Sequence, residues 1–295
     1  MIRKNQISPL AAKYRSKGII AIVISLILAG IILLIAMYAN NGNFLWLLIF
    51  VAIPVAFAYA FNAEYNSRVK NETIIKLFSE DFENVNYKIK EGFSKEEIEY
   101  TDLFKIGTSY TTNDDLRGVF NGVEFRRADV VSSTTYSTGK TTHTVYHFHG
   151  QIYQFPFNKE TFGRHKITST WAGLGRNRSN LNMQKIALDH REFEKVFQAY
   201  TNNPQELYYI LTPHLMDKIL EIEEEYKATL LVSIVDRIIY LGFFSNKDRL
   251  EPNVFKDLDN SYFTDIRSEI ARIKNLITVL NLEDDYFMSN TKGEE

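Results

Sequence analysis

Two long apolar runs without any acidic or basic side chain lie near the start of the chain, and only four residues separate them. The first run covers residues 18–39 and the second covers residues 44–61. At a rise of about 1.5 Å per residue, helices over these runs would be about 33 Å and about 27 Å long, close to the thickness of a bilayer core. Because residues 40–43 cannot cross a bilayer, the sequence predicts a two-helix transmembrane hairpin.

The charges beside the hairpin predict its orientation. Residues 1–17 are basic and contain no acidic side chain, and Arg68, Lys70 and Lys76 follow the second run. By the positive-inside rule, both termini lie in the cytoplasm. A cleaved signal peptide is disfavoured because the first run is too long and a second run follows at once. The uninterrupted lengths also disfavour a pair of buried helices in a soluble core.

The composition excludes several classes of protein. The chain has no cysteine, so disulfides, thiolate nucleophiles, iron–sulfur clusters and Cys-based zinc sites are excluded. With 34 basic and 36 acidic residues, the formal net charge is −2, which disfavours nucleic acid as a partner. No sequence motif for a cofactor is convincing, and we expect none to be bound.

The rest of the chain predicts a soluble α+β domain with an antiparallel sheet and packed helices. Strand patterns and helix patterns come in separate blocks, and no βαβ unit is apparent. We expect a helical connector over residues 62–104, an α+β domain over 105–258, and a C-terminal helix with an acidic tail over 259–295.

Several local patterns place individual strands. Asn121-Gly122 between apolar pairs predicts a tight β-hairpin, and Asp236-Arg237 predicts a second one. The Ser/Thr-rich residues 132–142 predict a flexible hairpin tip. Near Gly150 the apolar residues change parity, which predicts a β-bulge there.

Other patterns place the helices. Ser94 and Glu97 form a capping box, and Pro204 and Pro213 each occupy a first helical position after Asn203 or Thr212. A further helix is predicted to begin at Asp189 and to carry Phe193, Val196 and Phe197 on one face. Residues 223–225, three consecutive glutamates, predict the solvated face of a helix.

Three histidines are the strongest candidates for a metal site. His143, His147 and His149 have the same parity on one predicted strand, and imidazoles two residues apart can bind a transition metal. No carboxylate lies close to them in sequence, so a solvated or strand-pairing histidine face is the favoured interpretation.

A basic segment is a candidate for contact with the membrane surface. Its basic side chains are Lys159, Arg164, Lys166, Arg176, Arg178 and Lys185, against one acid, Glu160. Anionic lipid headgroups attract basic residues held close to a membrane by about 1 kcal/mol each. A basic loop that only keeps the surface soluble is the alternative.

Motifs of known enzymes give no catalytic site. Gly173-x-Gly175 lacks the third glycine and the strand-to-helix context of a phosphate-binding loop. No serine-hydrolase, zinc-protease, P-loop or kinase motif occurs. The sequence therefore predicts no catalytic residue.

The order of several segments resembles a bacterial family of membrane-anchored proteins known as domain of unknown function 3137. The resemblance rests on EFEKVF at 192–197, LTPHLM at 211–216, residues 232–244, LEP at 250–252, and more weakly on DLRG at 115–118 and FHG at 148–150. It implies an N-terminal membrane hairpin before a soluble domain and a bacterial inner-membrane location. The family has no established activity, so the resemblance implies no catalytic residue.

Two functions are compatible with these patterns. The first is a membrane-tethered cytoplasmic binding or scaffold protein, with the lipid bilayer, anionic lipid headgroups and an unidentified protein as its partners. The second is a membrane-bound enzyme whose active site in the α+β domain has no recognisable motif.

Overall fold

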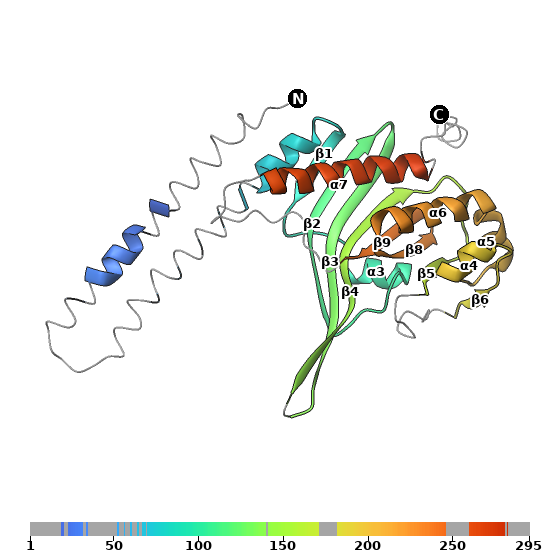
Figure 1. Cartoon of the computed structure of the whole chain (residues 1–295), viewed down its shortest axis with the longest axis horizontal. Helices are drawn as coiled ribbons and strands as arrows, with labels where there is room; N and C mark the ends of the chain where they lie inside the picture. The colour runs from blue at the N-terminus through green and yellow to red at the C-terminus, as the bar shows by residue number, and fades with distance from the viewer. Residues whose placement is uncertain are drawn as a thin grey trace, which may run out of the picture. The chain divides into compact units, whose positions relative to one another are not determined.

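The computed structural model describes residues 70–139, 141–170, 182–245, 260–280 and 282. Nearer the N-terminus it describes residues 19–20, 23–31, 34, 52, 56, 60, 64 and 67–68. The chain divides into two compact units, Met1–Leu77 with Leu250–Arg267, and Phe78–Arg249 with Ser268–Glu295. The second unit contains the sheet (Figure 1).

The first unit includes the segment predicted to be a transmembrane hairpin. Residues 23–31 and 70–77 are helical. In the run 18–39, 10 of 22 residues lie outside the described residues, as do 15 of 18 in the run 44–61 and all of residues 1–17. Of the helices that the structure describes, none is both long enough and apolar enough to cross a bilayer.

The second unit is built on one antiparallel sheet of nine strands. The spatial order is β1-β2-β3-β4-β9-β8-β5-β7-β6, and each described pair of neighbours is antiparallel. The strands are β1 Glu83–Lys88, β2 Ser109–Phe120, β3 Val123–Ser137, β4 Thr142–Pro156, β5 His165–Ser169, β6 Gln184–Ile186, β7 Phe197–Thr201, β8 Thr229–Val235 and β9 Ile238–Phe244. The predicted α+β class with an antiparallel sheet is confirmed.

The labelled helices are α3 Lys95–Thr101, α4 Arg191–Val196, α5 Pro204–Ile210, α6 Pro213–Tyr226 and α7 Asn260–Val279. The predicted capping box is confirmed, since the Ser94 hydroxyl accepts from the Glu97 backbone N–H and the Glu97 carboxylate accepts from the Ser94 N–H. Asn203 and Thr212 cap α5 and α6, each with proline in the first turn, as predicted. These helix starts are therefore specified locally.

Both predicted tight hairpins are also confirmed. Asn121 and Gly122 have φ angles of 49° and 78° between β2 and β3, and Asp236 and Arg237 have φ angles of 50° and 59° between β8 and β9. Positive φ at both central residues gives a turn whose twist matches the twist of the flanking strands.

The two faces of the sheet contact different helices because successive strand residues point to opposite sides. On one face, which we call the α3 face, a core is formed by Phe93, Ile98, Leu103, Phe104, Ala128, Val130, Phe148, Ile152 and Leu231. On the other, which we call the α7 face, Arg127 and Tyr153 contact Glu269 of α7. The Phe243 ring meets the Tyr226 ring of α6 on that same face, with centroids 5.3 Å apart.

Two strands lie where the sequence predicts helix. β1 falls within the predicted helical connector 62–104, where buried Tyr87 donates a hydrogen bond of 2.6 Å to Asp114. β7 begins at Phe197, which was predicted to lie on a helix, and it pairs with both β5 and β6. The helix predictions are wrong at these positions because sheet pairing and burial outweigh a weak local preference.

Three local details also differ from the predictions. His190 caps α4 in place of Asp189, since its Nδ1 accepts from the Phe193 N–H at 3.2 Å. The bulge in β4 falls at His147, between the partners of Ser132 and Ser133, and not at Gly150. The predicted tip at 132–142 is mostly regular strand, because β3 continues to residue 137 and β4 starts at residue 142.

A buried ionic network joins the sheet to α7. The fully buried guanidinium of Arg127 donates to both oxygens of Asp129, at 2.7 and 2.9 Å, and its Nε donates to Glu269 at 3.1 Å. Glu269 also accepts from the Tyr153 hydroxyl. Burial acts to lower the pKa of Arg127, but Asp129 and Glu269 outweigh it and hold the pKa well above its ordinary value. Arg127 is therefore a cation in the folded protein.

We predict that Glu269→Leu destabilises the second unit by about 3–5 kcal/mol, because it leaves a buried cation without one of its carboxylates. Urea unfolding of the purified full-length chain measures the loss. Arg267→Gln, at an exposed position of the same helix, should change the stability by less than about 0.5 kcal/mol. Equal losses in the two variants would contradict a stabilising role for the network.

Candidate functional site

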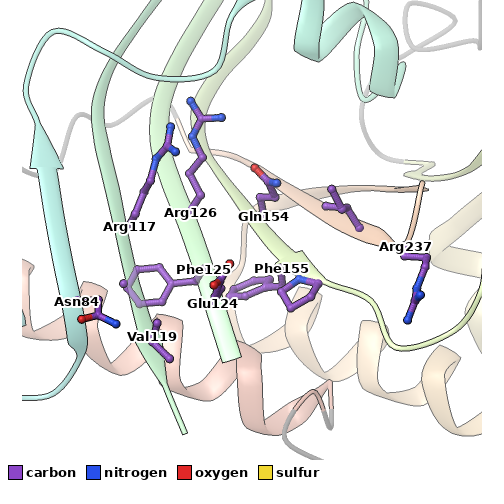
Figure 2. Close-up of a pocket in the computed structure, with 12 residues that line it drawn as sticks. Asn84, Arg117, Val119, Glu124, Phe125, Arg126, Gln154, Phe155 and Arg237 are labelled. Atoms are coloured by element: carbon purple, nitrogen blue, oxygen red, sulfur yellow. The ribbon is translucent and has the colours of Figure 1, made fainter. Parts of the chain in front are cut away.

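A groove opens on the α3 face of the sheet, where β2, β3 and β4 lie beside the turn between β8 and β9 (Figure 2). Its volume is about 420 Å³, within the range of small-ligand sites. Its polar lining residues are Asn84, Arg117, Glu124, Arg126, Gln154 and Arg237. We call it the arginine groove, after Arg117, Arg126 and Arg237.

A buried carboxylate positions two of these arginines. Arg117 of β2 and Arg126 of β3 are directly opposed across the strand pair, and Figure 2 shows their side chains extending side by side. Asp115 accepts from the Nε of Arg117 at 2.9 Å and from the Nε of Arg126 at 2.6 Å. Because the Asp115 side chain is only 2% exposed, it fixes both guanidinium groups at their inner ends.

Arg126 is an anchored member of the groove. Its Nη1 donates to Glu97 of α3 and its Nη2 donates to the Gly92 carbonyl, each at 2.8 Å. Its guanidinium also lies 4.3 Å from the centre of the Phe93 ring. Burial acts to lower the pKa of Arg126, but Asp115 and Glu97 outweigh it and raise the pKa above its ordinary value. Arg126 therefore supplies a positive charge that hydrogen bonds to Asp115, Glu97 and Gly92 hold in place.

Arg117 and Arg237 are the exposed arginines of the groove lining. The Arg117 side chain is 52% exposed, and within the described part of the chain it is bonded only through Nε. Arg237 lies in the exposed β8–β9 turn, where the Thr161 hydroxyl accepts from its backbone N–H at 2.7 Å. Their planar N–H forks suit carboxylate and phosphate groups.

The groove offers little for covalent catalysis. None of its described lining residues is a serine, threonine, histidine or lysine, and Glu124 is its one carboxylate. General acid–base catalysis and nucleophilic catalysis both need further groups within hydrogen-bond reach. The arrangement fits recognition of a ligand better than its conversion.

The sequence does not predict this site. The spacing of Asp115 and Arg117 puts opposite charges two residues apart on one strand face, which is the local pattern that could have indicated it. The predicted hairpin at Asn121-Gly122 brings Arg126 opposite Arg117. That Arg237 joins them depends on strand order, because β9 pairs with β4 across a long sequence separation.

The three candidate metal-binding histidines do not converge. His143 lies 3.2 Å from the Thr141 hydroxyl, and His147 lies 2.8 Å from the Thr134 hydroxyl. The ring of His149 packs near Tyr146, with centroids 5.4 Å apart. A group of three or more metal-ligating side chains is not found among the described residues.

The predicted basic segment is divided in the structure. Lys166 is buried, 3.8 Å from Asp102, and so cannot contact a membrane surface. Arg164 stacks on the Tyr100 ring at 4.0 Å, and Lys159 donates to the Tyr209 carbonyl at 3.1 Å. Lys185 is exposed on β6. Arg176 and Arg178, like the Gly173–Gly175 loop, lie outside the described residues.

Part of the chain matches a known family. Residues 146–282 fit the family described as "Protein of unknown function (DUF3137)". This part of the chain is similar to that family. The predicted resemblance is thereby confirmed over these residues, which include Gln154 and Arg237 of the arginine groove, whereas Arg117 and Arg126 precede them.

The chain was also compared with curated proteins and with solved structures. A search of curated proteins finds no match. Among solved structures, the chain is similar to the crystal structure of the mycobacterial trehalose monomycolate transport factor A, TtfA, with 9% sequence identity and a TM-score of 0.36. The alignment covers 72% of this chain and 94% of that chain.

Glu223 differs from the solvated glutamates expected at 223–225. It is half-buried near the end of α6 and accepts from the Leu230 N–H at 2.9 Å. Burial raises the pKa of its carboxyl to about 7, although hydrogen bonds from Leu230 and Ser169 act in the opposite direction. Glu223 therefore changes its charge close to neutral pH.

We predict that this shift makes stability depend on pH. Below its ordinary pKa of 4.5, the Glu223 carboxyl is neutral in both the folded and the unfolded protein. As the pH rises from 4.5 to about 7, this carboxyl ionises in the unfolded chain but stays neutral in the folded protein, so the stability that the raised pKa contributes is lost. Since one pKa unit is about 1.4 kcal/mol and the group is partly exposed, we expect a loss of about 1–2 kcal/mol.

Urea unfolding between pH 4.5 and 7.5, compared with Glu223→Gln, measures this contribution. The variant should lack this part of the pH dependence, whereas Glu224→Gln, at the exposed neighbouring position, should retain it. Parallel pH profiles for the wild type and Glu223→Gln would show that the buried carboxyl has no such effect.

Proposed function

We propose that this chain is a membrane-tethered cytoplasmic binding protein that recognises an anionic ligand in the arginine groove. The observation that carries the proposal is the arrangement around Asp115. This buried carboxylate orients Arg117 and Arg126 beside a cavity of about 420 Å³, and Arg237 lies at the same cavity. An arginine pair of this kind favours a phosphate or a carboxylate.

Gln154 supports a more specific ligand class. Its Oε1 is buried in the groove and has no hydrogen-bond partner within the described part of the chain. A buried acceptor without a donor is costly, so a ligand that supplies an O–H group would be favoured. The combination fits a phosphate with a neighbouring hydroxyl, as in a glycerol phosphate headgroup.

The proposed membrane tether would raise the effective concentration of such headgroups. A domain held near a bilayer by residues 18–61 meets lipid phosphates continually, so modest affinity would suffice. Contact of Lys185, Arg176 and Arg178 with anionic headgroups stays part of this proposal. A scaffold role with a protein partner would use the same tether.

We predict that glycerol phosphate binds the purified full-length chain more tightly than inorganic phosphate does, and that glycerol alone does not bind. Arg117→Ala and Arg237→Ala should each weaken binding of glycerol phosphate about 10-fold or more, because each removes a charge-assisted contact. Gln154→Leu should reduce the preference over inorganic phosphate. Calorimetric titration of the wild type and the three variants with each ligand, in neutral detergent, measures these affinities.

Arg191→Ala is the matched control, since Arg191 is an exposed arginine on α4. It should leave the affinity unchanged. Equal weakening by Arg191→Ala would mean that binding follows overall charge, and that the groove has no special role.

The tether is tested by its topology. In a bacterial host, a fluorescent protein fused after Lys70 should fluoresce, and alkaline phosphatase fused there should be inactive. Phosphatase fused after Asn41, in the predicted loop of the hairpin, should be active. Phosphatase activity after Lys70 would overturn the proposed cytoplasmic location.

A further inference from the structure

The strands β3 and β4 extend beyond the rest of the sheet as a two-stranded arm, seen below the sheet in Figure 1. The pairing of β2 with β3 ends at Ser133, and the pairing of β9 with β4 begins at Gly150. Between these limits β3 and β4 pair only with each other, from Thr134 opposite Val145 to Ser137 opposite Thr142. We call residues 134–148 the β-arm.

The β-arm leaves a long strand edge open. On its β4 side, residues 142–148 have no neighbouring strand among the described residues, a length of about 24 Å. The rings of Tyr136 and Tyr146 are 55% and 46% exposed on it. A two-stranded ribbon is only marginally stable by itself, and added strands stabilise it.

Apart from the bulge at His147, the β-arm lacks the features that normally protect an open edge. Residues 134–148 contain no proline and no acidic residue, and Lys140 is the one side chain with a permanent charge. Its exposed surface is formed mainly by threonine, tyrosine and histidine. Native proteins usually place charges, prolines or bulges along edges that must stay unpaired.

We propose that the β4 edge of the β-arm pairs with the same edge of a second copy of this chain. Two identical edges related by a twofold axis run antiparallel, which is the geometry of a closed, symmetric dimer. Because the arm is almost uncharged, its two copies do not repel each other, whereas an arm rich in one charge would. The paired arms form a four-stranded ribbon and cover each other's open edges.

The absence of cysteine from the chain allows a direct test. Single cysteines are introduced in turn as Thr142→Cys, His143→Cys, Thr144→Cys, Val145→Cys and Tyr146→Cys in the full-length chain in neutral detergent. Residues directly opposite in antiparallel strands have Cα atoms about 4.5–5.5 Å apart, which suits a disulfide. Oxidation should give a covalent dimer with one clear maximum along the arm.

Glu192→Cys, on exposed α4, is the control and should stay monomeric on a non-reducing gel. Uniform cross-linking along the arm, or none at any of the five positions, would overturn the proposal. A wild-type chain that sediments as a monomer at all concentrations would also overturn the proposal, because the open edge would then have to pair with a different protein.

A charge exchange tests the same contact without a disulfide. Thr144→Glu and Thr144→Lys each place like charges across the twofold axis, and each should raise the dimer dissociation constant at least about 10-fold. An equal mixture of the two variants should restore dimers, because opposite charges then meet. Sedimentation equilibrium measures this; a mixture that stays as monomeric as its components would contradict pairing through the β-arm.

Discussion

The guanidinium of Arg127 is fully buried, and a charge in that position costs several kcal/mol unless carboxylates offset it. Asp129 comes from the same strand, but Glu269 comes from α7, so the ionic contact also fixes that part of α7 on the sheet. Arg272, one helical turn further along, lies 4.4 Å from the centre of the Tyr226 ring. These contacts thus hold the C-terminal end of α6 to the middle of α7, and the middle of α7 to β3.

One irregularity in β2 connects this network with the arginine groove. The register with β3 shifts between Asn113 and Leu116, and Asp114 has a φ of 64°. As a result, Asp114 contributes to the field around Arg127 on the α7 face, whereas its neighbour Asp115 binds Arg126 on the α3 face. Of two adjacent aspartates, one therefore acts on Arg127 and the other binds the arginines of the groove.

The sequence predicts those parts of the fold that short segments determine. The turn at Asn121-Gly122, the capping box at Ser94 and the proline-led helices follow from a few neighbouring residues. β7 and the arginine groove could not be predicted in this way, because both depend on partners that are distant in sequence. Phe197 is buried in a strand only because β5 and β6 flank it, and Arg237 reaches the groove only because β9 lies beside β4.

The separation of Arg127 and Glu269 along the chain also has a consequence for biosynthesis. The two residues are 142 positions apart. At about 5–20 residues per second, a ribosome needs roughly 7–28 s to reach Glu269 after it has added Arg127. During that interval the cation of Arg127 lacks the Glu269 carboxylate. The second unit can therefore be completed only after α7 has emerged from the ribosome.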